Sequence, residues 1–164
     1  MKKTLLELLP PYPPYSSTLF HKNVVVFIIY LLFFIINIST YSRMEKNVLG
    51  KNLEICSCKP LTGWFRDGFC RYDLSDSGNH SICCVMNDNF LNYSKSQGNN
   101  LTTPIPEYSF PGLKNGDHWC ICLDRWKQAL LDGLAPKVIL ESTNIVVLKS
   151  VPLEKLKEYQ FNKK

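Results

Sequence analysis

Two stretches of the chain carry apolar residues at the spacing of an amphipathic helix. Over the first stretch the apolar side chains would share one helical face, and they are Ile82, Val85, Met86, Phe90 and Tyr93. Ser81 is suited to the N-cap, and Gly98 with Asn99 is suited to ending a helix. The pattern predicts a helix from about Ile82 to Gln97.

The second stretch, residues 117–131, fits two structures. As a helix it has one apolar face, which consists of Trp119, Cys122, Leu123, Trp126 and Leu130. Asp117 would then be the N-cap and Gly133 the stop. As a strand up to Leu123, alternation would place His118, Cys120 and Cys122 on one face. We favour the helix, because its pattern runs longer.

Shorter patterns complete the predicted fold. Residues 47–50 are typical of a strand ending in a turn, residues 138–140 of a buried strand, and Ser150 can cap a last helix that carries Leu153 and Leu156. Residues 99–116 hold three prolines and two glycines, and predict a long ordered loop in which Phe110 and Leu113 pack. We expect an α+β fold, a single small domain with two or three helices packed on a small sheet.

Residues 1–43 form a hydrophobic N-terminal extension with two interpretations. The run from Val24 to Ile38 is apolar apart from Asn37, but it is shorter than the roughly 20 residues that a membrane span needs. The literal interpretation is a membrane anchor through Val24–Ile38. The alternative is a mis-assigned start, with translation beginning at Met44, because the segment has the composition of translated AT-rich spacer and no cysteine.

The two interpretations place the cysteines in different compartments. All seven cysteines lie in residues 44–164, the predicted cysteine-rich globular domain. Translation from Met44 would make this a cytoplasmic protein with reduced thiols, whereas an exported, anchored form would favour disulfides. A membrane is therefore an expected partner only if residues 1–43 are translated.

Charge argues against a nucleic-acid partner. Residues 1–43 hold four basic residues and one acidic residue, and residues 44–164 hold fifteen and thirteen, so the domain carries only +2 of the total +5. No Lys/Arg cluster interleaved with aromatic residues marks a nucleic-acid surface.

Several long strings resemble one bacterial family. They are Asn47-Val48-Leu49-Gly50, Leu61-Thr62-Gly63-Trp64-Phe65-Arg66-Asp67-Gly68-Phe69-Cys70, Ser94-Lys95-Ser96-Gln97-Gly98-Asn99, Thr103-Pro104, Phe110-Pro111-Gly112-Leu113-Lys114, Gly116-Asp117-His118-Trp119-Cys120-Ile121-Cys122 and Arg125-Trp126-Lys127. The family is the uncharacterised "domain of unknown function 2237", and the resemblance covers about Asn47 to Tyr159. It implies no reaction, substrate or cofactor. It does imply a small stand-alone protein that begins shortly before Asn47, which supports Met44 as the start.

The resemblance also sorts the cysteines and marks two departures. Relatives usually carry cysteine at the positions of Cys56, Cys70, Cys83, Cys120 and Cys122. Cys58 and Cys84 look like additions. Relatives usually have Asp where Asn100 stands and His where Asn144 stands, so we assign no role to these two positions.

Seven cysteines in about 120 residues allow three chemistries. A metal site for zinc or iron would draw its ligands from Cys56, Cys70, Cys83, Cys120, His80 and His118, although the spacing is not that of a zinc ribbon. Thiol chemistry would use Cys83 and Cys120 as catalytic residues, because predicted helix starts and nearby histidines favour thiolates. In the third case the cysteines are structural and pack as small hydrophobic residues.

Three other polar residues are candidates for a site. Arg66 and Asp67 sit between two glycines, where they would bind an anion, orient a ligand or form a turn ion pair, and Asp117 is first a helix cap. The leading hypothesis is a cysteine-centred site that binds a metal or performs thiol redox chemistry, and the sequence does not decide whether the protein is an enzyme. The alternative is a binding or adaptor module that uses the 99–116 loop, with structural cysteines and an exposed apolar patch around Phe110 and Leu113.

Overall fold

The computed structural model describes residues 26–32 and 45–162. The chain divides into two units, Met1–Arg43 and Met44–Lys164. In the first unit, residues 26–32 are helical. Within the described ranges, no helix has the length and apolar character needed to cross a membrane. The anchor proposed for Val24–Ile38 and the start at Met44 lie largely outside the described residues.

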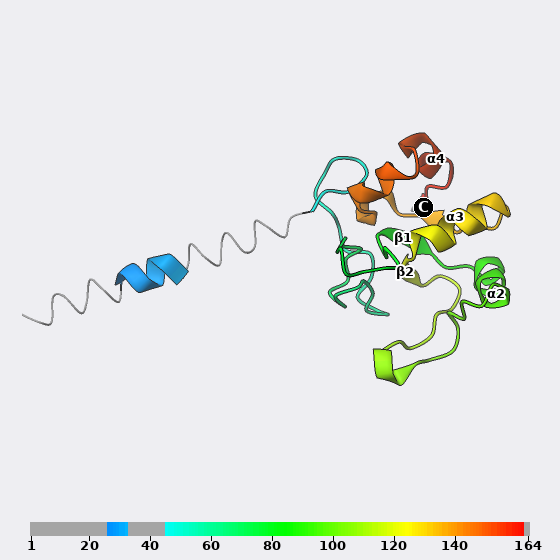
Figure 1. The fold of residues 1–164 in the computed structure, drawn as a ribbon, viewed down its shortest axis with the longest axis horizontal. Coiled ribbons are helices and arrows are strands. Elements are labelled where there is room, and N and C mark those ends of the chain that lie inside the picture. The colour runs from blue at the N-terminus through cyan, green and yellow to red at the C-terminus, as the bar shows by residue number, and fades with distance from the viewer. Residues whose placement is uncertain (1–25, 33–44, 163–164) are drawn as a thin grey trace, which may run out of the picture. The chain divides into compact units, whose positions relative to one another are not determined.

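The second unit is built on a three-stranded antiparallel sheet. The strands are β1 (Ile82–Val85), β2 (His118–Ile121) and β3 (Lys137–Val138), in the order β2-β1-β3. Three α-helices accompany the sheet, namely α2 (Asp88–Ser96), α3 (Leu123–Leu131) and α4 (Leu153–Glu158) (Figure 1). This arrangement confirms the predicted α+β class.

The predicted helix over residues 82–97 is wrong in its first part, because Ile82–Val85 is the central strand β1. Ile82, Cys83 and Cys84 are all buried, so both faces of this strand are covered. A strand that is covered on both faces loses its alternating pattern and cannot be distinguished from a buried helix by periodicity. The helix starts at Asp88 after the N-cap Asn87, whose side chain accepts from the Phe90 N–H at 2.8 Å, and Ser81 caps nothing.

The stretch 117–131 combines the two predicted structures. Residues 118–121 form β2, as the strand interpretation had it, and α3 starts only at Leu123. The preferred continuous helix is therefore wrong. Asp117 is not a helix cap, because its carboxylate accepts from the Lys114 N–H at 2.9 Å and closes the turn before β2. Gly133 follows the helix with a positive φ of 70°, as expected of a helix stop.

The ends of the domain are less regular than predicted. Residues 47–50 form a turn with isolated bridges rather than a strand, and the strand expected at 138–140 is the two-residue β3 followed by a 3₁₀ turn at Leu140–Ser142. The last helix begins after Pro152, not after Ser150, which ends the 3₁₀ segment Ile145–Lys149. Proline favours this boundary because it has no N–H to leave unpaired.

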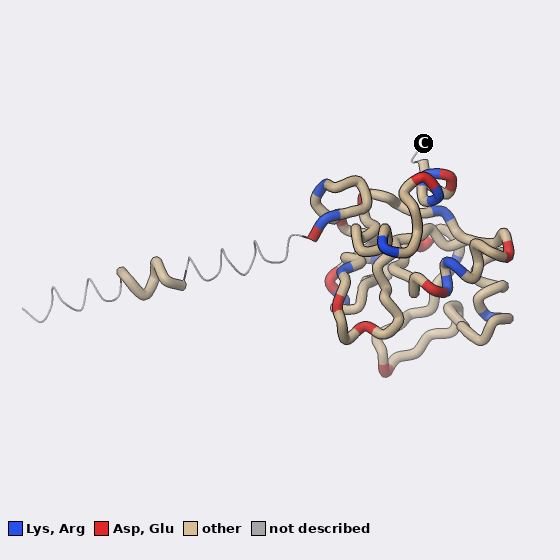
Figure 2. The backbone as a smooth tube through the Cα atoms, turned by 45° about the horizontal axis from the view of Figure 1, so that its top comes forward, with Lys and Arg blue, Asp and Glu red and all other residues tan. Residues whose placement is uncertain are grey.

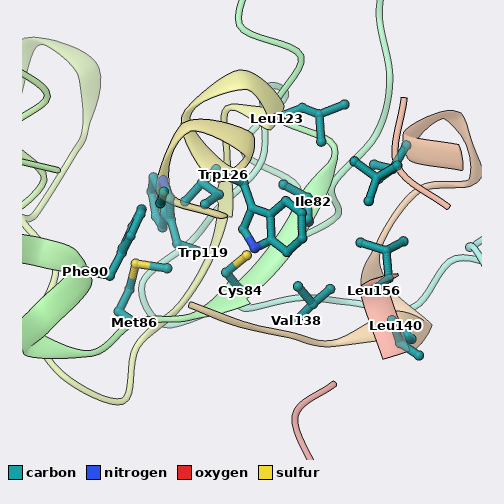
Figure 3. Packing of buried hydrophobic residues seen from close by; sticks show 14 of the residues in the cluster. Ile82, Cys84, Met86, Phe90, Trp119, Leu123, Trp126, Val138, Leu140 and Leu156 are labelled. Carbon is teal, nitrogen blue, oxygen red and sulfur yellow. The ribbon is translucent and has the colours of Figure 1, made fainter. Parts of the chain in front are cut away.

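The sheet separates two hydrophobic clusters, because neighbouring residues of β1 and β2 point to opposite faces. The larger cluster holds Ile82, Cys84, Trp119, Ile121 and Trp126 with residues of α2, β3 and α4 (Figure 3). The smaller cluster consists of Cys56, Cys70, Cys83, Cys120 and Ile139. We call these the apolar face and the cysteine face.

The loop over residues 99–116 is ordered and packs on the domain, as predicted. Its tip contains the 3₁₀ turn Pro106–Tyr108, closed by backbone bonds between Ile105 and Phe110 (Figure 1). Phe110 is 8% exposed and Leu113 is 4% exposed. The adaptor hypothesis predicted that these two residues are exposed, and that prediction is wrong.

Candidate functional site

Four of the seven cysteines form two adjacent disulfides on the cysteine face. Cys56 is joined to Cys83 and Cys70 to Cys120, with Cα–Cα distances of 5.8 and 5.3 Å. Cys83 and Cys120 are directly opposite each other in the β1–β2 ladder. The sulfur atoms of Cys56, Cys70 and Cys83 lie within 4.8 Å of one another, and all four residues are buried. The convergence on which the cysteine hypothesis depended is present.

The segment 56–70 reaches this position through a tight double turn. The Cys56 N–H donates to the carbonyl of Gly68, and the Gly68 N–H donates to the carbonyl of Thr62. Gly63 has φ +90°, and a Cβ there would lie 2.2 Å from the carbonyl oxygen of Phe69. Only glycine fits this position, which explains why a Thr-Gly pair occurs in the turn that carries Cys56 and Cys70.

Two buried threonines complete the backbone bonding beside the disulfides. The Cys120 N–H donates to Thr62 Oγ1 at 2.9 Å, and the Cys83 N–H donates to Thr143 Oγ1 at 3.1 Å. Thr143 in turn donates to the carbonyl of Ile139 at 2.8 Å. A buried N–H without a hydrogen-bond acceptor is costly. The two hydroxyls therefore accept from N–H groups that a neighbouring strand would satisfy in a wider sheet.

The predicted reason for thiolate character is wrong. Cys83 and Cys120 lie within strands rather than at helix starts, and both are in disulfides. Neither sulfur is therefore stabilised by a helix dipole. Thiol chemistry of these two residues would therefore start from disulfides rather than from free thiolates.

The two histidines lie near the cysteines but are not in the sulfur cluster. His80 Nδ1 is 2.8 Å from a carboxylate oxygen of Asp76, whose side chain is almost fully buried. The His118 ring lies 3.3 Å from the carbonyl oxygen of Cys56 and packs against Phe161. In the described part of the chain, the group of side chains close enough to share a metal ion contains cysteines alone.

The remaining three cysteines are free thiols in different settings. Cys58 is exposed, and Cys122, at the N-cap of α3, is partly exposed. Cys84 is buried in the apolar face, and this burial raises the pKa of its thiol well above the usual range because the charged form would be desolvated. Cys84 is thus held as a neutral thiol.

One pocket adjoins the Cys70–Cys120 disulfide. It has a volume of about 530 Å³, and its lining consists of Gly63, Trp64, Arg66, His80, Asn99, Asn100, Leu101, Ile105, Tyr108, Phe110, Trp119 and Cys120. The pocket therefore combines a disulfide cysteine, four aromatic side chains and one guanidinium. We call it the aromatic pocket.

A second pocket adjoins the other disulfide. It has a volume of about 440 Å³, and Cys56 and His118 contribute to its lining together with Glu54, Glu141 and Phe161. Each disulfide thus has one member at the wall of a pocket, although all four cysteines are almost inaccessible from bulk solvent.

The expected Arg66–Asp67 ion pair is replaced by a different one. Asp67 pairs with Arg71, whose Nε lies 2.6 Å from the carboxylate, and also accepts from the Phe69 N–H. Arg66 turns instead toward the aromatic pocket, 5.2 Å above the ring of Trp119. The two neighbours in sequence therefore serve different parts of the structure.

Sequence reasoning missed several residues that shape the site. Asp76 is one of them. The sequence feature that could have identified it is its position, four residues before His80 in a loop that contains Gly78. Thr62 and Thr143 are others, and they carried no local signal because their partners are 58 and 60 residues away. Trp64 and Tyr108 are exposed aromatic residues, and no local pattern in the sequence marks them as members of one pocket.

The fold and this site define a small α+β domain with two disulfides beside its sheet. A family model described as "Uncharacterized protein conserved in bacteria (DUF2237)" matches residues 46–160, and the chain belongs to this family. No curated protein matches the chain.

Proposed function

We propose that the domain is a thiol–disulfide redox protein in which the two disulfides exchange with each other. The observation that carries the proposal is the position of the Cys70 sulfur, within 4.8 Å of both sulfurs of the Cys56–Cys83 bridge. A thiolate so placed needs only a small movement to attack the neighbouring bridge. Exchange proceeds by such an attack on a disulfide sulfur.

The reaction takes a dithiol reductant as its electron donor. A thiolate of the reductant attacks the Cys120 sulfur from the aromatic pocket, and Cys70 leaves as a thiolate. Cys70 then attacks the Cys56–Cys83 bridge, forms a new disulfide with one of its sulfurs and releases the other as a thiolate.

The second thiol of the reductant resolves the mixed disulfide and releases Cys120. The reductant becomes a disulfide, and the two original protein bridges become one new bridge and two thiols. The two protons of the reductant pass to those thiols, which are Cys120 and either Cys56 or Cys83.

The test is limited reduction of the full-length protein followed by trapping. We expect one equivalent of dithiothreitol to release two thiols per chain, and peptide mapping after iodoacetamide to find Cys70 linked to Cys56 or Cys83. Recovery of free Cys70 and Cys120 with an intact Cys56–Cys83 bridge would overturn the exchange. A Cys58→Ser variant is the matched control, because Cys58 is exposed and unpaired, and it should give the same map.

A metal site is a second candidate, supported by the same sulfur geometry. Tetrahedral zinc with Zn–S bonds of about 2.3 Å places its sulfurs about 3.8 Å apart. The sulfurs of Cys56, Cys70 and Cys83 lie within 4.8 Å of one another, so reduction of the bridges would leave them near enough to bind one ion. Cys56, Cys70, Cys83 and Cys120 would hold zinc or iron in the fully reduced protein. Elemental analysis of protein purified without oxygen or chelator would give one metal per chain and four protected thiols, whereas unprotected thiols would reject this candidate.

A further inference from the structure

The guanidinium of Arg66 carries a positive charge that no acidic side chain neutralises among the described residues. Its Nη1 donates to the carbonyl of Gly63 at 3.1 Å and its Nη2 to the carbonyl of Tyr108 at 3.3 Å. The nearest carboxylate in sequence, Asp67, is paired with Arg71. Arginine has five N–H donors, so this group keeps donors for a further partner.

The walls around this guanidinium are aromatic and contain no acidic residue. Trp64, Tyr108, Phe110 and Trp119 line the pocket, and the other polar side chains are His80, Asn99 and Asn100. Trp64 and Tyr108 are 45% and 71% exposed. One face of the Trp64 ring stacks on His80, and its other face is open to a ligand. Figure 2 shows the positions of basic and acidic residues interspersed over the domain, so this local excess of positive charge does not belong to a larger basic face.

The pocket offers one cation without an acidic partner. His80 Nδ1 lies 2.8 Å from the buried carboxylate of Asp76, which is not part of the lining. Arg66 donates to two backbone carbonyls and, among the described residues, to no carboxylate. A guanidinium can donate two parallel hydrogen bonds to either a carboxylate or a phosphate. One such cation balances the single charge of a carboxylate but only part of the charge of a phosphate dianion.

The backbone of Arg66 supports the same conclusion. Its φ is +51°, in the left-handed region that non-glycine residues rarely occupy. Such a conformation is unfavourable and persists only where the surroundings hold it, often at ligand sites. Here it directs the side chain away from the adjacent Asp67 and over Trp119.

We propose that the aromatic pocket binds a planar aromatic carboxylate, with its ring against Trp64 and Tyr108 and its carboxylate on Arg66. This inference goes beyond the redox proposal, because binding requires no change in the disulfides. The bound ligand would lie beside Cys120.

The test compares two probes of the same shape on the oxidised full-length protein by isothermal titration calorimetry. We expect 2-naphthoate to bind at least tenfold more tightly than neutral 2-naphthamide, since a charge-assisted bond in a partly dry site is worth about a factor of ten or more. Arg66→Gln should remove this preference and leave the affinity for 2-naphthamide unchanged. Lys114→Gln, an exposed cation outside the pocket lining, is the matched control and should change neither.

Two further variants keep the result interpretable if Arg66→Gln is unstable. Asn100→Asp retains the oxygen that accepts from the Thr102 and Thr103 N–H groups, but places a carboxylate in the lining, so it should weaken naphthoate binding alone. Trp64→Ala should weaken both probes by similar factors. Equal affinity for the two probes, no binding of naphthoate at millimolar concentration, or unchanged preference in both Arg66→Gln and Asn100→Asp would overturn the proposal.

Discussion

The two faces of the sheet are held in different ways. On the apolar face, large side chains from all three helices interlock, with Trp126 fully buried at the centre (Figure 3). On the cysteine face, four half-cystines and Ile139 take the place of a core, covered by a loop with little regular structure. One face depends on burial of apolar area, and the other on covalent bonds.

The difference shows how a small domain can close the second side of a sheet. About 115 residues do not supply two full layers of large apolar side chains, because the surface-to-volume ratio limits the core. A disulfide needs little volume and ties a loop to a strand directly. Because the cysteine face depends on disulfides, it is sensitive to redox conditions, whereas the apolar face is not.

The largest expected effect comes from reducing both disulfides. The bridges close loops with sequence separations of 27 and 50 residues, which the chain-entropy relation values at about 3.5 and 4 kcal/mol. We expect metal-free reduction to lower the free energy of unfolding by about 4 to 7 kcal/mol, measured by urea denaturation with and without a phosphine reductant. An unchanged midpoint would mean that the cysteine face is held by packing instead.

The next effect tests the apolar face. Trp126→Ala removes a fully buried indole and the hydrogen bond from its Nε1 to the carbonyl of Pro136. We expect a loss of about 3–5 kcal/mol in the free energy of unfolding, with both disulfides still formed by thiol count. Equal losses in oxidised and reduced protein would show that the two faces contribute independently.

A smaller effect separates the two threonines beside the disulfides. Thr143→Val removes an acceptor of one N–H and a donor to one carbonyl, whereas Thr62→Val removes only the acceptor bond to Cys120. Each buried group left without a partner costs about 1–3 kcal/mol. Thermal denaturation should therefore rank Thr143→Val as more destabilising than Thr62→Val, and the reverse order would contradict these assignments.

The smallest effect is a pH dependence at the edge of the apolar face, against which Tyr93 packs. A hydrogen bond to Asp132, 2.5 Å from the Tyr93 hydroxyl, raises the pKa of Tyr93 above its usual value. The raised pKa means that the folded state favours the neutral phenol. The hydrogen bond therefore stabilises the folded state below pH 10, and this stabilisation is lost as the pH rises through the folded pKa. Difference absorbance of phenolate should show a later titration in wild type than in Asp132→Asn.

The sequence predicted the class of the fold and the gathering of cysteines, but not the local structure that produces it. Phe90 and Tyr93 mark α2 correctly because one side of that helix is exposed to solvent, whereas Met86 lies before its N-cap. The strand at Ile82–Val85 fits the helical pattern equally well, because both of its sides are buried and no polar residue interrupts it.

The details of the site depended on long-range geometry. Four cysteines can pair in three ways, and nothing local selects Cys56 with Cys83. Asp67 and Arg66 looked like partners because they are adjacent in sequence, but Arg71 is the residue that reaches Asp67. The aromatic pocket combines residues from four separate segments, so its composition becomes visible only once the chain is folded.

Cys84 gives the protein a built-in reporter of its own opening. It is adjacent in sequence to the disulfide-bonded Cys83 but lies on the other face of the sheet, buried and neutral. A labelling reagent can reach this sulfur only when the residues of the apolar face move apart. The rate at which Cys84 is modified therefore measures how often the native domain opens, without any dye, tag or engineered probe.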